Sequence, residues 1–152
     1  MTEQELLLRL ERLEARGEIE NLMARYQHYY TLRNSQAILD ELAGIAPVHV
    51  VRGNNDKEWA EAIPHALTFT LDGMTFYMIH NKKEVPADLS GVDVVVFGHS
   101  HKYLQKEKDG ILWLNPGSCG PRRFHQEITM MMAEIADGHI QVTKITIPHE
   151  VK

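Results

Sequence analysis

Three Asp-Gly dipeptides, each between two strand-like runs, constrain the fold of this chain more than any other feature. They stand at 72–73, 109–110 and 137–138. Asp-Gly favours the two-residue turns with positive φ that join neighbouring antiparallel strands. The first dipeptide separates 66–71 (ALTFTL) from 74–79 (MTFYMI), and the last separates 128–135 from 139–147. The sequence therefore predicts three β-hairpins.

Two further runs in this part of the chain are typical of strands. Residues 47–52 (PVHVVR) form a short apolar run, which predicts a strand that ends in Gly53-Asn54-Asn55-Asp56. Residues 92–97 (VDVVVF) are apolar almost throughout, as expected of a strand that is buried on both faces of a sheet.

Residues 1–45 have a different, helical pattern. Leu6, Leu10 and Leu13 recur at helical spacing, with Glu and Arg between them. Gly17 predicts a joint between two helical stretches, and a third helix is expected from about Ser35 to near 44. Helices followed by mostly antiparallel strands predict an α+β sandwich rather than a doubly wound sheet.

Composition limits the classes of function. The 152 residues suffice for one domain with a small appendage, and the formal charge of −5 argues against nucleic acid as a partner. No apolar run approaches the roughly 20 residues of a membrane span. The lone Cys119 fits a reducing compartment, so we expect a cytoplasmic protein.

Side chains that bind metal ions follow three of the predicted strands. Asn54 follows the first, His80 ends a hairpin strand, and His99 and His101 follow the apolar strand within Gly98-His99-Ser100-His101. In an extended segment residues two apart point the same way, so these two imidazoles can reach one ion or two adjacent ions. Imidazole and amide donors suit Mn, Fe, Zn or Ni better than Ca or Mg. We therefore expect a metal site at these strand ends.

The order and spacing of four motifs resemble the calcineurin-like metallophosphoesterase superfamily, in particular its small bacterial and archaeal phosphodiesterases. The motifs are 53–56 (GNND), the strand ending in His80, 98–101 (GHSH), and 114–118 (LNPGS) followed by Pro-Arg. The resemblance covers about 36–147. It implies part of an αββα sandwich, with Asn54, His80 and His99 on one ion and His101 on a second. It also implies manganese as the divalent metal, with Ni, Zn or Fe as alternatives.

The same resemblance implies supporting roles around the metal. Asp56 would contact the metal ligands, and Asn55 takes the position where many family members carry a catalytic histidine. Asn115 and Ser118 would border the site, although Pro116-Gly117 between them also predicts a simple turn. Arg122 would bind a substrate phosphate or lie in a solvated loop.

Two carboxylate motifs of the family are missing. Its members open with one strand ending in D-x-H and another ending in G-D. This chain has no Gly-Asp, and its one D-x-H, Asp137-Gly138-His139, lies in a predicted hairpin turn. We therefore expect a helical segment over 1–35 and a metallophosphoesterase-like domain over 36–152, truncated at its N-terminal side. Residues 17–34 resemble the opening helices of NTF2-like (SnoaL-like) domains.

The sequence leaves three functions open. The first is a phosphodiesterase or phosphatase, in which metal-bound hydroxide attacks a small phosphoester. Four neutral ligands compensate the charge of two ions poorly, so one ion with bound water is the preferred form. The second is an inactive family member that serves as a binding or assembly module, and the third is a half-site completed by a partner chain. The N-terminal leucines cover a sheet face or drive dimerisation, and we expect a homo-oligomer.

Overall fold

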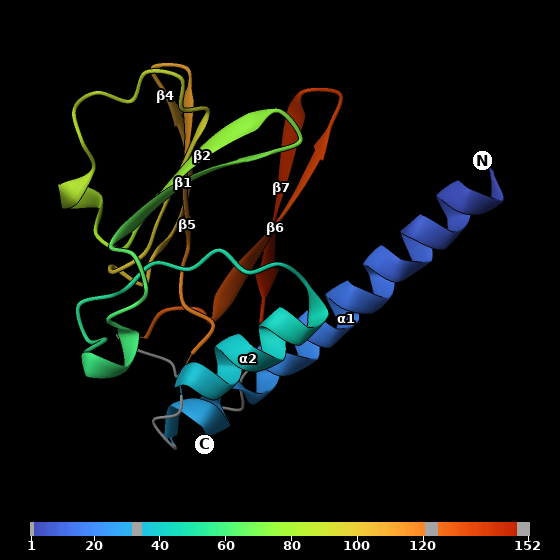
Figure 1. The fold of residues 1–152 in the computed structure, drawn as a ribbon, viewed down its shortest axis with the longest axis horizontal. Coiled ribbons are helices and arrows are strands. Elements are labelled where there is room, and N and C mark those ends of the chain that lie inside the picture. The colour runs from blue at the N-terminus through green and yellow to red at the C-terminus, as the bar shows by residue number, and fades with distance from the viewer. Residues whose placement is uncertain (1, 32–34, 121–124, 149–152) are drawn as a thin grey trace. The chain divides into compact units, whose positions relative to one another are not determined.

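The computed structural model describes residues 2–31, 35–120 and 125–148, which form two compact units, 1–48 and 49–152 (Figure 1). The first unit holds two helices, α1 (Glu3–Thr31) and α2 (Ser35–Ile45). A capping box begins α1, because Thr2 Oγ1 accepts from Glu5 N at 3.2 Å while Glu5 Oε2 accepts from Thr2 N at 2.6 Å. Leu22 and Ile38 are buried, one on each helix.

The predicted joint at Gly17 is wrong, since α1 runs through this residue as one continuous helix. A single glycine costs an α-helix only about 1 kcal/mol, which the surrounding helix formers offset. The next prediction is confirmed, because α2 begins at Ser35 and ends at Ile45, next to Gly44.

The second unit is built on a five-stranded mixed sheet in the order β1-β2-β3-β5-β4. Its strands are β1 (Ala66–Leu71), β2 (Met74–Ile79), β3 (Val94–Phe97), β4 (Tyr103–Lys108) and β5 (Ile111–Pro116). A separate two-stranded sheet contains β6 (Thr129–Ala136) and β7 (His139–Thr146). Two short 3₁₀ helices, η1 (Glu58–Ala60) and η2 (Lys82–Glu84), lie in the connections.

All three predicted hairpins are confirmed. They join β1 to β2, β4 to β5, and β6 to β7, each as an antiparallel pair. Both residues of each Asp-Gly turn have positive φ, for example 46° at Asp72 and 83° at Gly73. These are the backbone angles that make Asp-Gly a hairpin signal. The other two pairings, β2 with β3 and β3 with β5, are parallel.

The central strand β3 is buried on both faces, as its apolar run predicted. Val94 packs on one face with Phe76 and Leu114, against partly buried residues of β6 and β7. Val95 and Phe97 pack on the other face with Ile79, against the connection that contains Val85, Leu89 and Val92. The β6–β7 hairpin thus covers one face of the five-stranded sheet, while part of a loop covers the other, and the α+β sandwich is confirmed.

The strand predicted over 47–52 is wrong. These residues have no regular secondary structure, and Arg52 N donates to Pro64 O at 2.9 Å. His49, in the same segment, stacks on Phe69 of the edge strand β1, with ring centroids 3.9 Å apart. An apolar run becomes a strand only where another strand offers hydrogen bonds, and none does so here among the described residues.

Candidate metal centre

The parallel pairing of β2 and β3 brings two histidines to one edge of the sheet. Ile79 and Phe97 are opposite each other in the register, so the residues that follow them leave the sheet side by side. Gly98 N donates to His80 O at 3.0 Å and extends the pairing by one step. This hydrogen bond joins the backbones of His80 and Gly98, and His99 follows directly, so the two histidines start close together.

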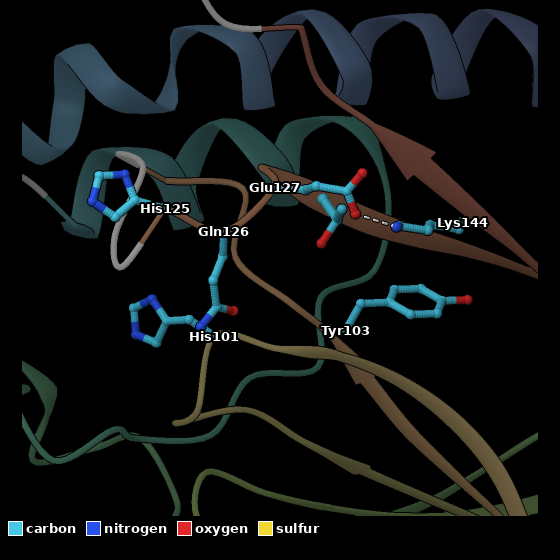
Figure 2. A pocket seen from close by; sticks show the side chains of 7 residues that line it. His101, Tyr103, His125, Gln126, Glu127 and Lys144 are labelled. Carbon is cyan, nitrogen blue, oxygen red and sulfur yellow. Dashed lines mark hydrogen bonds and ion pairs between the residues drawn. The ribbon is translucent and has the colours of Figure 1, made fainter.

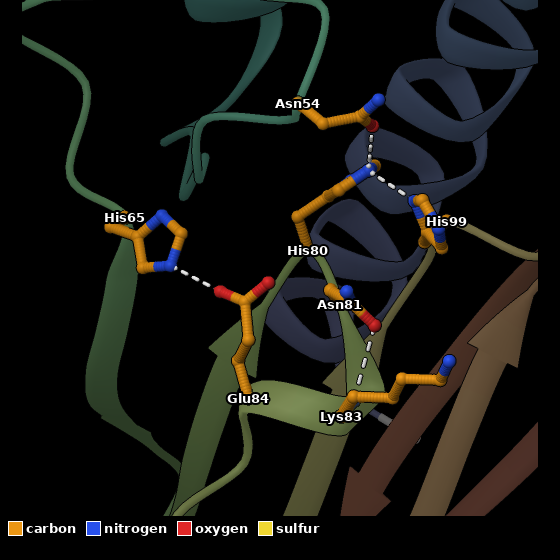
Figure 3. Close-up of polar contacts among 7 residues, drawn as sticks. All are labelled: Asn54, His65, His80, Asn81, Lys83, Glu84 and His99. Carbon is orange, nitrogen blue, oxygen red and sulfur yellow. Dashed lines mark hydrogen bonds and ion pairs between the residues drawn. The ribbon is translucent and has the colours of Figure 1, made fainter.

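Three donor atoms meet at this edge (Figure 3). His80 Nε2 lies 2.8 Å from Asn54 Oδ1 and 3.2 Å from His99 Nδ1. The two imidazole rings are almost perpendicular, at 84°, with centroids 5.2 Å apart. The structure thus brings together Asn54, His80 and His99, which sequence analysis assigned to one ion.

These distances fit the donor shell of one metal ion. Transition metals bind imidazole nitrogen at about 2.0–2.1 Å, so two neighbouring ligands of one octahedral or tetrahedral ion lie roughly 2.8–3.4 Å apart. Two imidazole nitrogens and an amide oxygen suit Zn, Mn, Fe or Ni. Among the described residues no three His, Cys, Asp or Glu side chains cluster around a common point. The two imidazole nitrogens and the amide oxygen can supply part of the coordination shell of one divalent ion.

The loop before η1 is shaped around His80. Asp56 Oδ2 accepts from Gly53 N at 2.8 Å and closes a tight turn. A Cβ atom at Gly53 would lie 3.2 Å from both Asp56 Oδ2 and His80 Cε1, so this backbone passes close to the imidazole. Asn54 Nδ2 donates to Asn55 Oδ1 at 3.3 Å, which turns the Asn54 oxygen toward His80. Asp56 thus closes the turn beside His80, and Asn55 orients the Asn54 amide.

The environment of His80 favours its neutral form. Burial lowers the pKa of His80 from its ordinary value, and the nearby His99 lowers it further. The carboxylates of Asp56 and Glu84 oppose this shift. Neutral imidazole is the form that binds metals, so the direction of this pKa shift supports a ligand role.

Asn115 fixes the loop that carries His99. It is fully buried, and its Nδ2 donates to Gly98 O at 2.9 Å and to Ser100 Oγ at 3.1 Å. Its Oδ1 accepts from Gly117 N at 3.0 Å. One side chain on β5 therefore links the loop after β3 to the turn after β5.

The turn after β5 is closely packed. Gly117 has a φ of 84°, and a Cβ there would overlap the hydroxyl of Thr129, which donates to Pro116 O at 2.8 Å. Ser118 Oγ accepts from Gly120 N at 3.4 Å, and its carbonyl accepts from Thr129 N at 3.0 Å. Ser118 thus has structural contacts at this turn. The predicted phosphate ligand Arg122 lies outside the described residues.

His101 follows His99 by two residues and contributes to the lowered pKa of His80. It lines a pocket of about 400 Å³ with Tyr103, His125, Gln126, Glu127, Thr129 and Lys144 (Figure 2). His99 and His101 have φ values of 64° and 58°, an uncommon conformation for residues other than glycine that clusters at functional sites. This backbone is not the extended one assumed from the sequence, so the alternation of side chains predicted for 98–101 does not hold.

Sequence analysis missed the rest of this pocket. Lys144 Nζ lies 2.5 Å from Glu127 Oε2 and 5.0 Å from the centre of the Tyr103 ring. These residues belong to β7, to the segment before β6 and to β4. No motif connects them, because their proximity depends on how the β6–β7 hairpin packs on the larger sheet.

Comparison with known families identifies the chain. The profile of the calcineurin-like phosphoesterase superfamily domain matches residues 19–138, from within α1 to the β6–β7 turn. This chain belongs to the calcineurin-like phosphoesterase superfamily. The resemblance read from four motifs is confirmed, while the domain boundary at 35/36 and the NTF2-like segment stay predictions.

Members of the superfamily from archaea show sequence similarity. The chain is 31% identical over 107 residues to a probable metallophosphoesterase of Methanothermobacter thermautotrophicus, covering 64% of this chain and 62% of that protein. It is 31% identical over 83 residues to a phosphodiesterase of Methanocaldococcus jannaschii, covering 44% and 50%. The chain thus spans between half and two thirds of the length of these relatives.

A solved structure supports the fold. The crystal structure of a predicted phosphoesterase from Streptococcus pneumoniae superposes with a TM-score of 0.59 at 21% identity, covering 89% of this chain and 87% of that one. The superfamily fold is therefore present in the described part of the chain. No described helix has both the length and the apolar character that a membrane span requires.

Proposed function

We propose that this superfamily member is a metal-dependent phosphoesterase that hydrolyses small phosphodiesters. The observation that supports it is the convergence of three side chains. His80 Nε2 lies 2.8 Å from Asn54 Oδ1 and 3.2 Å from His99 Nδ1. The archaeal relative named a phosphodiesterase supports the same class of substrate. We assign the metal-binding and catalytic roles to these three residues, and a fourth such role to His101.

One divalent ion, with manganese first and Ni, Zn or Fe as alternatives, would activate water and polarise a phosphoryl oxygen at neutral pH. The protein supplies the orientation of the donors. Asn55 aims the Asn54 amide, Asp56 fixes the turn beside His80, and Asn115 anchors the His99 loop. A single ion is favoured because three neutral donors leave the charge of a second ion uncompensated.

The deciding experiment measures Mn²⁺-dependent hydrolysis of bis-p-nitrophenyl phosphate by the wild type and by His99→Ala. We expect a rate above the metal blank in the wild type and its loss in His99→Ala, because the metal loses one donor. His139→Ala, an exposed histidine in the β6–β7 hairpin, is the matched control and should keep the wild-type rate. Mn²⁺ binding, followed by calorimetry, should weaken in His99→Ala but not in His139→Ala. If the wild type hydrolyses the substrate no faster than the metal blank, the proposal that this chain is an enzyme by itself is wrong.

A second candidate is a half-site completed by a partner chain. It is favoured by the chemistry of the three converging donors, which are two imidazole nitrogens and an amide oxygen without a carboxylate. In this case the isolated chain binds Mn²⁺ through His80 and His99 but hydrolyses nothing. An inactive binding or assembly module would bind no Mn²⁺ at these residues, so calorimetry separates the two.

The proposal also includes the cellular compartment and the oligomeric state. We place the protein in the cytoplasm, because a sequence with a single cysteine, Cys119, suits a reducing compartment. We also propose a homo-oligomer.

A further inference from the structure

The first half of α1 exposes a cluster of leucines. Their exposed fractions are 44% for Leu6, 54% for Leu7, 49% for Leu8, 48% for Leu10 and 53% for Leu13. Scattered surface leucines are ordinary, but five within eight positions concentrate exposed apolar side chains on this half of α1. Figure 1 shows this half of α1 extending past α2. The leucines among these that share one face of the helix indicate a surface that another molecule covers.

Three of these leucines form a narrow seam along the helix. Leu6, Leu10 and Leu13 follow the spacing of four and then three residues that defines the contact positions of a coiled coil. Gly17 takes the next contact position and has no side chain, so the seam ends there. The buried Leu22 lies on the opposite side of α1, where the helix meets α2. The seam can therefore receive a partner without displacing α2.

The charges beside the seam indicate the partner and its direction. Arg9 directly precedes the contact position of Leu10, Glu14 directly follows that of Leu13, and both are exposed. In a parallel coiled coil, the residue directly before a contact position, such as Arg9, faces the residue five positions later on the other helix. Arg9 of one copy then faces Glu14 of the other, twice per dimer. An antiparallel pair would place arginines at 9 and 16 against each other.

The same charges argue against a lipid surface as the partner. Helices that lie on anionic membranes carry an excess of Lys and Arg on their polar face. Over 3–16, α1 has four Glu, at 3, 5, 11 and 14, and three Arg, at 9, 12 and 16. This mixture suits a protein helix with the complementary pattern, and α1 of a second copy has that pattern.

We propose that the seam of Leu6, Leu10 and Leu13 pairs with the same seam of a second copy as a short parallel coiled coil. The interface holds three leucine layers, so the association is weak and depends on protein concentration. This inference concerns α1 alone and does not depend on the proposed catalytic function.

The first test is sedimentation equilibrium of the full chain over a series of concentrations. The wild type should shift from monomer to dimer, and Leu10→Asp should remain monomeric at every concentration. Leu8→Asp is the matched control, because Leu8 is equally exposed but lies on the other side of the helix. It should dimerise like the wild type. A monomeric wild type, or equal losses in both variants, would overturn the proposal.

The second test reverses charges and does not depend on removing a leucine. Arg9→Glu alone and Glu14→Arg alone should each dimerise about tenfold or more weakly, because like charges then face each other. A mixture of the two variants should form a heterodimer of wild-type strength, because both facing pairs are again opposite in charge. Circular dichroism checks that the helix content is kept. Single variants that dimerise normally, or a mixture that stays monomeric, would overturn the parallel arrangement.

Discussion

Asn115 concentrates three hydrogen bonds on one buried amide at the edge of the candidate metal centre. Its partners are Gly98 O, Ser100 Oγ and Gly117 N. Asparagine suits this position because one side chain supplies both a donor and an acceptor. Sequence analysis placed Asn115 beside the site, but the contacts that anchor the His99 loop depend on how β5 lies against β3.

Asn115→Ala should lower the free energy of unfolding by about 2–4 kcal/mol, because three polar groups lose their partner inside the protein. The measurement is urea denaturation without metal. Asn81→Ala is the control, since Asn81 Oδ1 makes one exposed bond with Lys83 N at 3.1 Å. It should cost about 1 kcal/mol or less. Equal losses in the two variants would contradict the anchoring role of Asn115.

The lowered pKa of His80 has a consequence for stability. When the pH falls below the ordinary histidine value, the unfolded chain binds a proton at this residue before the folded chain does. The unfolded state is then favoured, so the stability of the metal-free protein should fall as the pH falls from about 7 to about 5. In His80→Asn this fall should be shallower. Denaturation over the pH series, with His139→Asn as the exposed control, checks it, and an unchanged slope in His80→Asn would refute it.

At the scale of elements, the sequence predicted the turns and strands that depend on their own residues, but not whether a run finds a neighbouring strand to pair with. Asp72-Gly73 defined its hairpin because the turn conformation is a property of those two residues. The residues at 92–97 predicted the buried strand β3 because their composition reflects burial on two faces. The run at 47–52 has similar composition, yet a strand also requires a neighbour in register.

In the candidate site, too, the features set by local sequence were predictable and those set by tertiary packing were not. Asn54, His80 and His99 were predictable because each follows an apolar run or marks its end. The left-handed backbone at His99 and His101 was not, since it reflects the turn that the Asn115 contacts impose. Tyr103 and Lys144 were missed because they meet only when two sheets pack together.

Amide hydrogen exchange should separate the two apolar runs. The amides of 47–51 should exchange quickly, because no strand protects them among the described residues, while those of β3 should exchange slowly between two parallel neighbours. Arg52, which donates to Pro64 O, should be intermediate. Slow exchange throughout 47–51 would show that a partner, such as a second chain, pairs with this segment.

The whole molecule divides between Val48 and His49. Both hydrophobic clusters of the second unit consist of residues after position 65, and the residues from Ala46 to His49 have no regular helix or strand. A unit with its own core is expected to fold by itself. In the described part of the first unit, over 2–31 and 35–48, there are two helices, which are too few to bury a large core.

Residues 49–152 expressed alone should therefore fold. We expect a β-rich circular dichroism spectrum, cooperative thermal unfolding, and the same Mn²⁺ binding at His80 and His99 as in the full chain. The fragment should also be monomeric, since it lacks the leucine seam. An unfolded or aggregated fragment would show that the helical unit is needed for the fold of the second unit.

The contact between Gly117 and Thr129 also limits how this protein can change over generations. A side chain at 117 would meet the Thr129 hydroxyl, and its backbone angle would remain unfavourable even if that hydroxyl were lost. A change at position 117 must therefore be accompanied by a change at position 129 and by a different turn. Substitutions at positions 117 and 129 should therefore be rare, while the exposed residues of β7 should vary freely. In a set of descendants, the glycine would mark the end of β5 even after most of the surface had diverged.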